Sequence, residues 1–301
     1  MTTSYGRGGS AWNLQGAMFM ILAMGCFALE DALLKQAATS LPIGQVLLSF
    51  GILGFLTFSA LAIRAGEKPL SSSLLSPVML SRSAFEVTGR LFFMLAIALT
   101  PLSTASAILQ AAPLVVIAGA GMFFGEKVSL RRWVSVLVGF VGVVMILRPG
   151  AEGFSLLSLL AVIATLGFAG RDLATRAAPH SMSHRQLGVV GFLMLIIAGT
   201  IALPFGSWPE LPGTKAATCL FAAAIAGVIA YTALTIAMRT GEIAAVTPFR
   251  YTRLVFAMIA GILLFGERPD LWTILGSGIV IVSGLSALMP SRRIFRPVRD
   301  S

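Results

Sequence analysis

Long apolar stretches alternate with short polar breaks along nearly the whole chain. A helix needs about 20 mainly apolar residues to cross about 30 Å of hydrocarbon. The breaks are rich in Gly, Pro and Ser, as in "SLPIG" and "RPGAEG", and this composition is typical of turns. The pattern predicts ten membrane-spanning helices, at 14–34, 44–64, 76–98, 102–124, 132–148, 155–176, 186–205, 216–238, 243–265 and 271–289.

Composition agrees with this pattern. Of the 301 residues, 57% are hydrophobic and 11% are charged, with a mean hydropathy of +0.91. Soluble domains carry about 25% charged residues, so this chain lacks the polar surface that water requires. The first apolar run is longer than the core of a signal peptide, and we expect it to be retained. The sequence therefore predicts an all-α integral membrane protein.

Motifs for catalysis and for metal binding are absent from the sequence. Cys26 and Cys219 lie in apolar runs, and His180 and His184 lie in a polar loop, so we expect no disulfide, metal or cofactor. No GxxxxGK[ST], HExxH or GxSxG pattern occurs. We therefore do not expect an enzyme or an ATPase.

Lys and Arg are unevenly distributed between the two sets of breaks. With a cytoplasmic N-terminus, fourteen fall on the cytoplasmic side and four on the outer side. Both termini are then cytoplasmic, and the net charge of +10 reports topology and not a nucleic-acid surface. We expect the basic tail, residues 291–301, to lie on anionic lipid headgroups.

Two similar segments indicate an internal duplication. "FFGEKVSLRRW" (123–133) resembles "LLFGERPDLW" (263–272), and their glutamates, Glu126 and Glu267, are 141 residues apart. The same offset aligns further pairs: Asp31 with Asp172, Lys35 with Arg176, Arg90 with Tyr231, Gln110 with Tyr251, and Ser103 in "STASAIL" with Ala244 in "AAVTPFR". We infer a cytoplasmic segment 1–13, followed by two five-helix repeats, 14–149 and 150–290.

Because each repeat holds an odd number of spans, the second repeat must enter the membrane with opposite polarity. Inverted repeats of this kind are typical of secondary transporters, in which alternating access exchanges two equivalent conformations. Residues with equivalent roles then lie at opposite faces of the membrane.

Charged residues within the spans are the first candidates for a site, because they are costly there. Glu86 and Arg90 share a helix face with Arg82, and they form either a self-neutralising ion pair or part of a cavity. Arg250 and Arg253 have no acidic residue in their own span. They need a partner elsewhere, such as Glu86, or an anionic ligand.

Other candidates are assigned by position. The pairs Glu30–Asp31 and Arg171–Asp172 correspond between the repeats and are either gate residues or interfacial charges. We expect three uncharged polar residues to line the cavity and two prolines to act as flex points, because proline interrupts the hydrogen bonds of a helix. These are Gln110, Tyr231 and Tyr251, and Pro113 and Pro248.

Both repeats resemble EamA-type domains of the drug/metabolite transporter superfamily. The resemblance is carried by "AAPLVVIAGAGMFFGEKVSLRRWVSVLVGFVGVVMIL" (111–147) and "YTRLVFAMIAGILLFGERPDLWTILGSGIVIVSGLSAL" (251–288). These segments have a small-residue helix, a Gly-Glu ending and a Gly-rich last helix; the second has Leu254 in place of Pro113. The size and layout are similar to those of YddG-like bacterial exporters of aromatic amino acids.

This resemblance implies an exporter in the bacterial inner membrane, with a central cavity and amino acids or similar small metabolites as substrates. Glu86 is the first choice for a proton-linked carboxylate, and Arg90, Arg250 or Arg253 for holding a substrate carboxylate. The alternatives are an exporter of cationic drugs or quaternary amines, for which Glu86, Tyr231 and Tyr251 would suit a cation, and an uncoupled channel. Monomer and homodimer both stay open.

Overall fold

The computed structural model describes residues 8–70, 76–123, 125, 128–147, 155–176, 183–240 and 246–288. Within these ranges the regular structure is entirely helical, and each of the ten predicted spans corresponds to one helix or to two consecutive ones. The elements are α1 (Gly8–Ala37), α2 (Ile43–Arg64), α3 (Pro77–Leu99), α4 (Leu102–Leu109), α5 (Ala112–Phe123), α6 (Leu130–Leu147), α7 (Ser158–Arg176), α8 (His184–Ala202), η2 (Leu203–Phe205), α9 (Thr214–Thr240), η3 (Thr247–Tyr251), α11 (Thr252–Phe265) and α12 (Leu271–Leu288).

Many outward-facing side chains are large and apolar. Leu14, Phe140 and Val282, for example, are 64%, 47% and 66% exposed. Five segments of the described chain are long and apolar enough to cross a membrane: Leu14–Ala37, Ile43–Arg64, Leu102–Phe123, Arg185–Phe205 and Thr214–Ala237. The exposed apolar side chains give this helical bundle the surface that a lipid environment favours.

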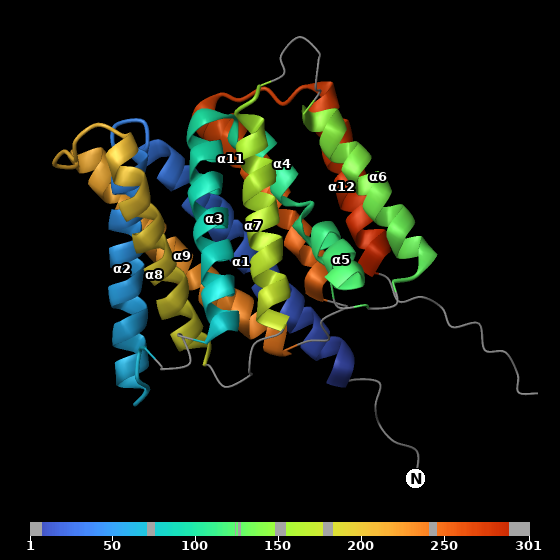
Figure 1. The fold of residues 1–301 in the computed structure, drawn as a ribbon, viewed down its shortest axis with the longest axis horizontal. Coiled ribbons are helices and arrows are strands. Elements are labelled where there is room, and N and C mark those ends of the chain that lie inside the picture. Colours follow the sequence, from blue (N-terminus) through green and yellow to red (C-terminus); the bar gives the residue numbers. More distant parts are fainter. Residues whose placement is uncertain are drawn as a thin grey trace, which may run out of the picture.

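Four pairs of helices make the main contacts of the bundle: α1 with α9, α2 with α8, α3 with α7, and α6 with α12 (Figure 1). Small residues permit the close approach. A Cβ atom on Gly142 of α6 would lie 2.8 Å from the carbonyl oxygen of Gly276 in α12. One on Gly51 of α2 would lie 2.8 Å from the amide nitrogen of Ile196 in α8. Both contacts are with backbone atoms, which cannot move away by a change of rotamer as a side chain can.

Two of the predicted spans are interrupted. The span predicted at 102–124 divides into α4 and α5, which are separated by Gln110 and Ala111. Pro113 therefore lies in the first turn of α5, where a missing N–H costs no helical hydrogen bond, and not inside a continuous helix as predicted. The span at 243–265 contains the 3₁₀ turn η3, with Pro248 at its start, followed by α11.

Glycines end the α5 and α11 segments in the same way. Gly125 and Gly266 both have φ near +62°, a left-handed conformation that only glycine adopts without strain. These two glycines are 141 residues apart, the same offset that aligns the two repeats.

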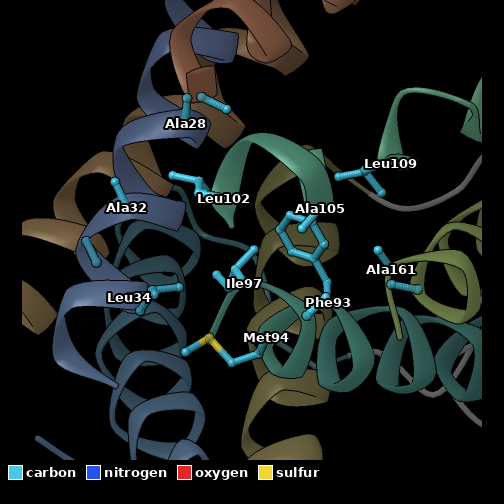
Figure 2. Close-up of a cluster of buried hydrophobic side chains, with 14 of the residues drawn as sticks. Ala28, Ala32, Leu34, Phe93, Met94, Ile97, Leu102, Ala105, Leu109 and Ala161 are labelled. Atoms are coloured by element: carbon cyan, nitrogen blue, oxygen red, sulfur yellow. The ribbon is translucent and has the colours of Figure 1, made fainter. Parts of the chain in front are cut away.

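One part of the hydrophobic core lies where α1, α3, α4 and α7 meet. Figure 2 shows side chains from all four helices in one apolar cluster, with Ala32 from α1, Phe93 from α3, Ala105 from α4 and Ala161 from α7. In Figure 1, α1 begins and α12 ends at the lower side of the molecule. The α3–α4 and α11–α12 connections lie at the upper side.

Candidate substrate site

An ion pair joins α1 to α11 inside the bundle. Asp31 of α1 accepts hydrogen bonds from Arg253 of α11, at 2.7 Å from Nη2 and 3.2 Å from Nε. The guanidinium of Arg253 also lies 5.0 Å from the ring centre of Phe27 and 5.7 Å from that of Phe93. The partner that Arg253 required is thus Asp31 and not Glu86.

Glu86 lies inside a group of arginines. Its carboxylate is 3.0 Å from Arg82 Nη1, 3.5 Å from Arg171 Nη1 and 4.0 Å from Arg90 Nε, and its side chain is only 3% exposed. The ion pair between Arg82 and Glu86 that the spacing predicts therefore forms, and it also contacts Arg171 of α7. Three cations around one buried carboxylate stabilise its charge.

Arg90 continues this charged group toward α1. Its Nη1 lies 3.8 Å from Glu30 Oε1, while its Nε faces Glu86. At the other side of the group, Arg171 Nη2 lies 2.8 Å from Asp172 Oδ1. The candidate gate residues Glu30, Asp31, Arg171 and Asp172 thus all belong to ion pairs inside the bundle.

Arg250 differs from the other arginines of the group. Its guanidinium makes no hydrogen bond or ion pair with any described residue, although it is close enough to Asp172 for an electrostatic interaction. Its backbone carbonyl accepts a hydrogen bond of 3.1 Å from Gln110 Nε2. The side chain of Gln110, at the interruption between α4 and α5, therefore donates a hydrogen bond to the backbone of η3.

Among the residues that the structure describes, the charges of this interior group do not balance. Among the described residues it comprises five arginines, Arg82, Arg90, Arg171, Arg250 and Arg253, and four carboxylates, Glu30, Asp31, Glu86 and Asp172. One positive charge is in excess, and Arg250 carries the guanidinium without a bound carboxylate. A charge within a membrane protein requires a partner or water.

A pocket borders this group between α1, α2, α3 and α8. Its lining includes Glu30, Asp31 and Arg90 together with the rings of Phe50 and Phe93. The pocket offers about 20 Å³ of space, room for about one water molecule, so it is too small for a metabolite in the described conformation.

The two tyrosines pack in different ways. The Tyr231 ring lies 5.4 Å from that of Phe58 in an edge-to-face arrangement. Tyr251 is buried against Gly284 of α12, and its hydroxyl has no hydrogen-bond partner among the described residues.

A second carboxylate site lies at the upper side of the molecule in Figure 1, and the sequence analysis did not assign it. Glu267, which follows α11, accepts hydrogen bonds from the backbone N–H of Leu102 and of Ser103, and one of 2.7 Å from the hydroxyl of Ser103. Lys35 Nζ lies 3.3 Å from Glu267 and donates a hydrogen bond of 2.6 Å to the carbonyl oxygen of Thr100.

The alignment of the chain with itself could have indicated this site, because Lys35 aligns with Arg176 and Glu267 with Glu126, each a residue of like charge. Glu126 and the side chain of Arg176, their counterparts, lie outside the described residues. No group of three or more potential metal ligands occurs in the described ranges.

The helical bundle and its apolar surface are those of a multi-pass membrane protein. The chain belongs to the EamA-like transporter family, whose model matches twice, at residues 14–148 and 155–288. The family is part of the drug/metabolite transporter superfamily.

Several relatives are similar over nearly the whole chain. A riboflavin transporter of Vibrio cholerae is 29% identical over 279 residues, which is 90% of this chain and 91% of that protein. The pseudopaline exporter CntI of Pseudomonas aeruginosa is 27% identical, over 92% of this chain and 97% of that protein. An S-adenosylmethionine uptake transporter of Rickettsia conorii is 25% identical, over 96% and 97%.

The fold is similar to that of a protein of known crystal structure. The TM-score is 0.59 with 17% sequence identity, over 93% of this chain and 96% of the other. At this identity the similarity concerns the fold alone.

Proposed function

We propose that this protein is a secondary-active transporter that exports carboxylate-bearing small metabolites, amino acids foremost, from the bacterial cytoplasm by alternating access. The observation that carries the proposal is Arg250, whose guanidinium is the one left over when the charges of this group are paired among the described residues. A substrate carboxylate would supply the missing negative charge, because a guanidinium donates a bidentate fork to such a group.

The named substrates of the relatives support transport of small metabolites. Riboflavin, pseudopaline and S-adenosylmethionine are chemically different, and the relatives include both an exporter and uptake transporters. The choice of a carboxylate substrate therefore rests on the charges of this chain. The same excess of positive charge disfavours the alternative of an exporter of cationic drugs.

Three features support alternating access through inverted repeats. The α1–α9 pair becomes the α3–α7 pair when the two repeats are exchanged, while the α2–α8 and α6–α12 pairs map onto themselves. The helix interruptions at Gln110 and Tyr251 correspond, as do the left-handed Gly125 and Gly266. Five spans in each repeat would give the two halves opposite polarity.

The orientation follows from the basic residues. We place the beginning of α1 and the end of α12, which share one side of the molecule, in the cytoplasm. The site of Lys35 and Glu267 then lies at the outer face. In this arrangement the charged group lies between the two faces, and the small closed pocket represents an occluded conformation.

For proton coupling, the contacts favour Glu30 over Glu86. Glu86 faces three arginines, whereas Glu30 has one cation, Arg90, at 3.8 Å and lies beside the carboxylate of Asp31. Its Oε2 also packs closely against Gly227 of α9, where a Cβ atom would come within 2.9 Å of it. A buried carboxylate with little compensation binds a proton more readily than one surrounded by cations.

Counterflow in proteoliposomes tests the proposal. Vesicles loaded with an unlabelled amino acid should take up the same amino acid in labelled form with saturation, and its amide, which lacks the carboxylate, should compete at least about tenfold less well. Aromatic amino acids, Thr and Met would be tested first. Counterflow of organic cations instead, or non-saturable flux typical of a channel, would overturn the proposal.

A further inference from the structure

One carboxylate, that of Glu267, connects three segments of the chain at the upper side of the molecule in Figure 1. Glu267 accepts hydrogen bonds from the N–H groups of Leu102 and Ser103 in the first turn of α4, and from the hydroxyl of Ser103. The first turn of a helix has free N–H groups and a partial positive charge, so a carboxylate is a favourable partner there.

Lys35 adds a third segment to this contact. Its ammonium group bonds to the carbonyl oxygen of Thr100 and lies 3.3 Å from Glu267, and the side chains of Lys35 and Glu267 are 13% and 9% exposed. The end of α1, the α3–α4 connection and the end of α11 are therefore joined at one point. We call the residues Lys35, Ser103 and Glu267 the outer clasp.

The corresponding positions of the other repeat carry the same charges but lack one hydrogen-bonding group. At the offset of 141, Glu267 aligns with Glu126 and Lys35 with Arg176, whereas Ser103 aligns with Ala244. Glu126 and Ala244 lie outside the described residues. An alanine side chain has no hydroxyl, so position 244 cannot donate the bond that Ser103 donates to Glu267.

We propose that the outer clasp, through the hydroxyl of Ser103, makes the outer face the one that the empty transporter keeps closed. This inference rests on the proposed alternating access and adds which of the two conformations predominates. A hydrogen bond to a charged group shifts an equilibrium by about tenfold or more, and in the proposed cycle this bond would break when the outer face opens. The empty protein would then open to the cytoplasm, where an exporter collects its substrate.

A cysteine in the pocket reports which face is open. Met94 lines the pocket and is 2% exposed, and it would be replaced by Cys after Cys26→Ala and Cys219→Ala. A membrane-impermeant maleimide would be applied in turn to right-side-out and inside-out vesicles. Ser103→Ala leaves the two backbone hydrogen bonds of Glu267 in place, so we expect this variant to fold.

We expect Ser103→Ala to raise the labelling rate from the outside by roughly tenfold and to lower the rate from the inside. Adding Ala244→Ser should enlarge both changes, because a hydroxyl at position 244 would favour closure of the cytoplasmic face and therefore the outward-open conformation. Unchanged rates in Ser103→Ala, or a rise from both sides, would overturn the inference. If substrate changed the labelling from neither side in the parent protein, alternating access itself would fail, which is a separate outcome.

Discussion

The guanidinium of Arg253 lies 2.7 Å from the carboxylate of Asp31, and this contact joins α1 of the first repeat to α11 of the second. The side chain of Asp31 is 4% exposed and that of Arg253 is 18% exposed. The ring centres of Phe27 and Phe93 lie 5.0 and 5.7 Å from the guanidinium. The pair is therefore a buried link between the two halves.

Removing one member of this pair should destabilise the protein. We expect Asp31→Asn and Arg253→Gln each to cost about 3 kcal/mol, because each leaves an uncompensated buried charge. The double variant should cost clearly less than the sum of the two, and thermal unfolding in detergent would measure this. Strict additivity of the two single effects would show that the contact contributes nothing.

Glu30 should control the response of transport to pH. We expect Glu30→Gln to abolish the effect of a pH gradient on net flux, because an amide cannot bind and release the proton. Counterflow at equal pH on both sides should persist in this variant. Flux measurements with and without the gradient test the prediction, and a gradient effect of parental size in Glu30→Gln would exclude Glu30 as the proton site.

Replacement by alanine should destabilise the protein at Gly142 of α6 but not at Gly278 of α12. A Cβ atom on Gly142 would meet the backbone of Gly276, so Gly142→Ala should destabilise the protein by about 1–3 kcal/mol. Gly278 has nothing within 4 Å of such an atom, and Gly278→Ala should be neutral or stabilising by up to about 1 kcal/mol. Equal melting temperatures for the two variants would contradict the described packing.

The positions of the helices could be predicted from the sequence because the lipid environment imposes one simple rule. Each span must be apolar and about 20 residues long, and the pattern of apolar residues reports this directly. The interruption at Gln110 was not predicted. The apolar pattern continues through this position, and Pro113 instead predicted a break three residues further on.

The partners of the interior charges could be predicted only in part. The Arg82–Glu86 pair follows from the spacing of four residues along one helix. The pairs of Asp31 with Arg253 and of Lys35 with Glu267 join residues 222 and 232 positions apart, and only the packing of the helices brings them together. The role of Glu267 was not predictable for the same reason, because its partners are backbone and side-chain groups of α1 and α4, which are distant in sequence.

The central claim is that Arg250 binds the carboxylate of the substrate. It is tested most directly by the preference of the Arg250→Gln variant for an amino acid over the corresponding amide. Counterflow of one amino acid would be competed with that amino acid and with its amide, in the parent protein and in Arg250→Gln. Arg185→Gln serves as the matched control, because Arg185 already has a carboxylate partner, Glu67, at 2.6 Å.

We expect the parent protein and Arg185→Gln to prefer the acid by at least about tenfold, and Arg250→Gln to lose most of this preference while it still transports. Such a result would identify Arg250 as the residue that binds the substrate carboxylate. An undiminished preference for the acid in Arg250→Gln would contradict the account.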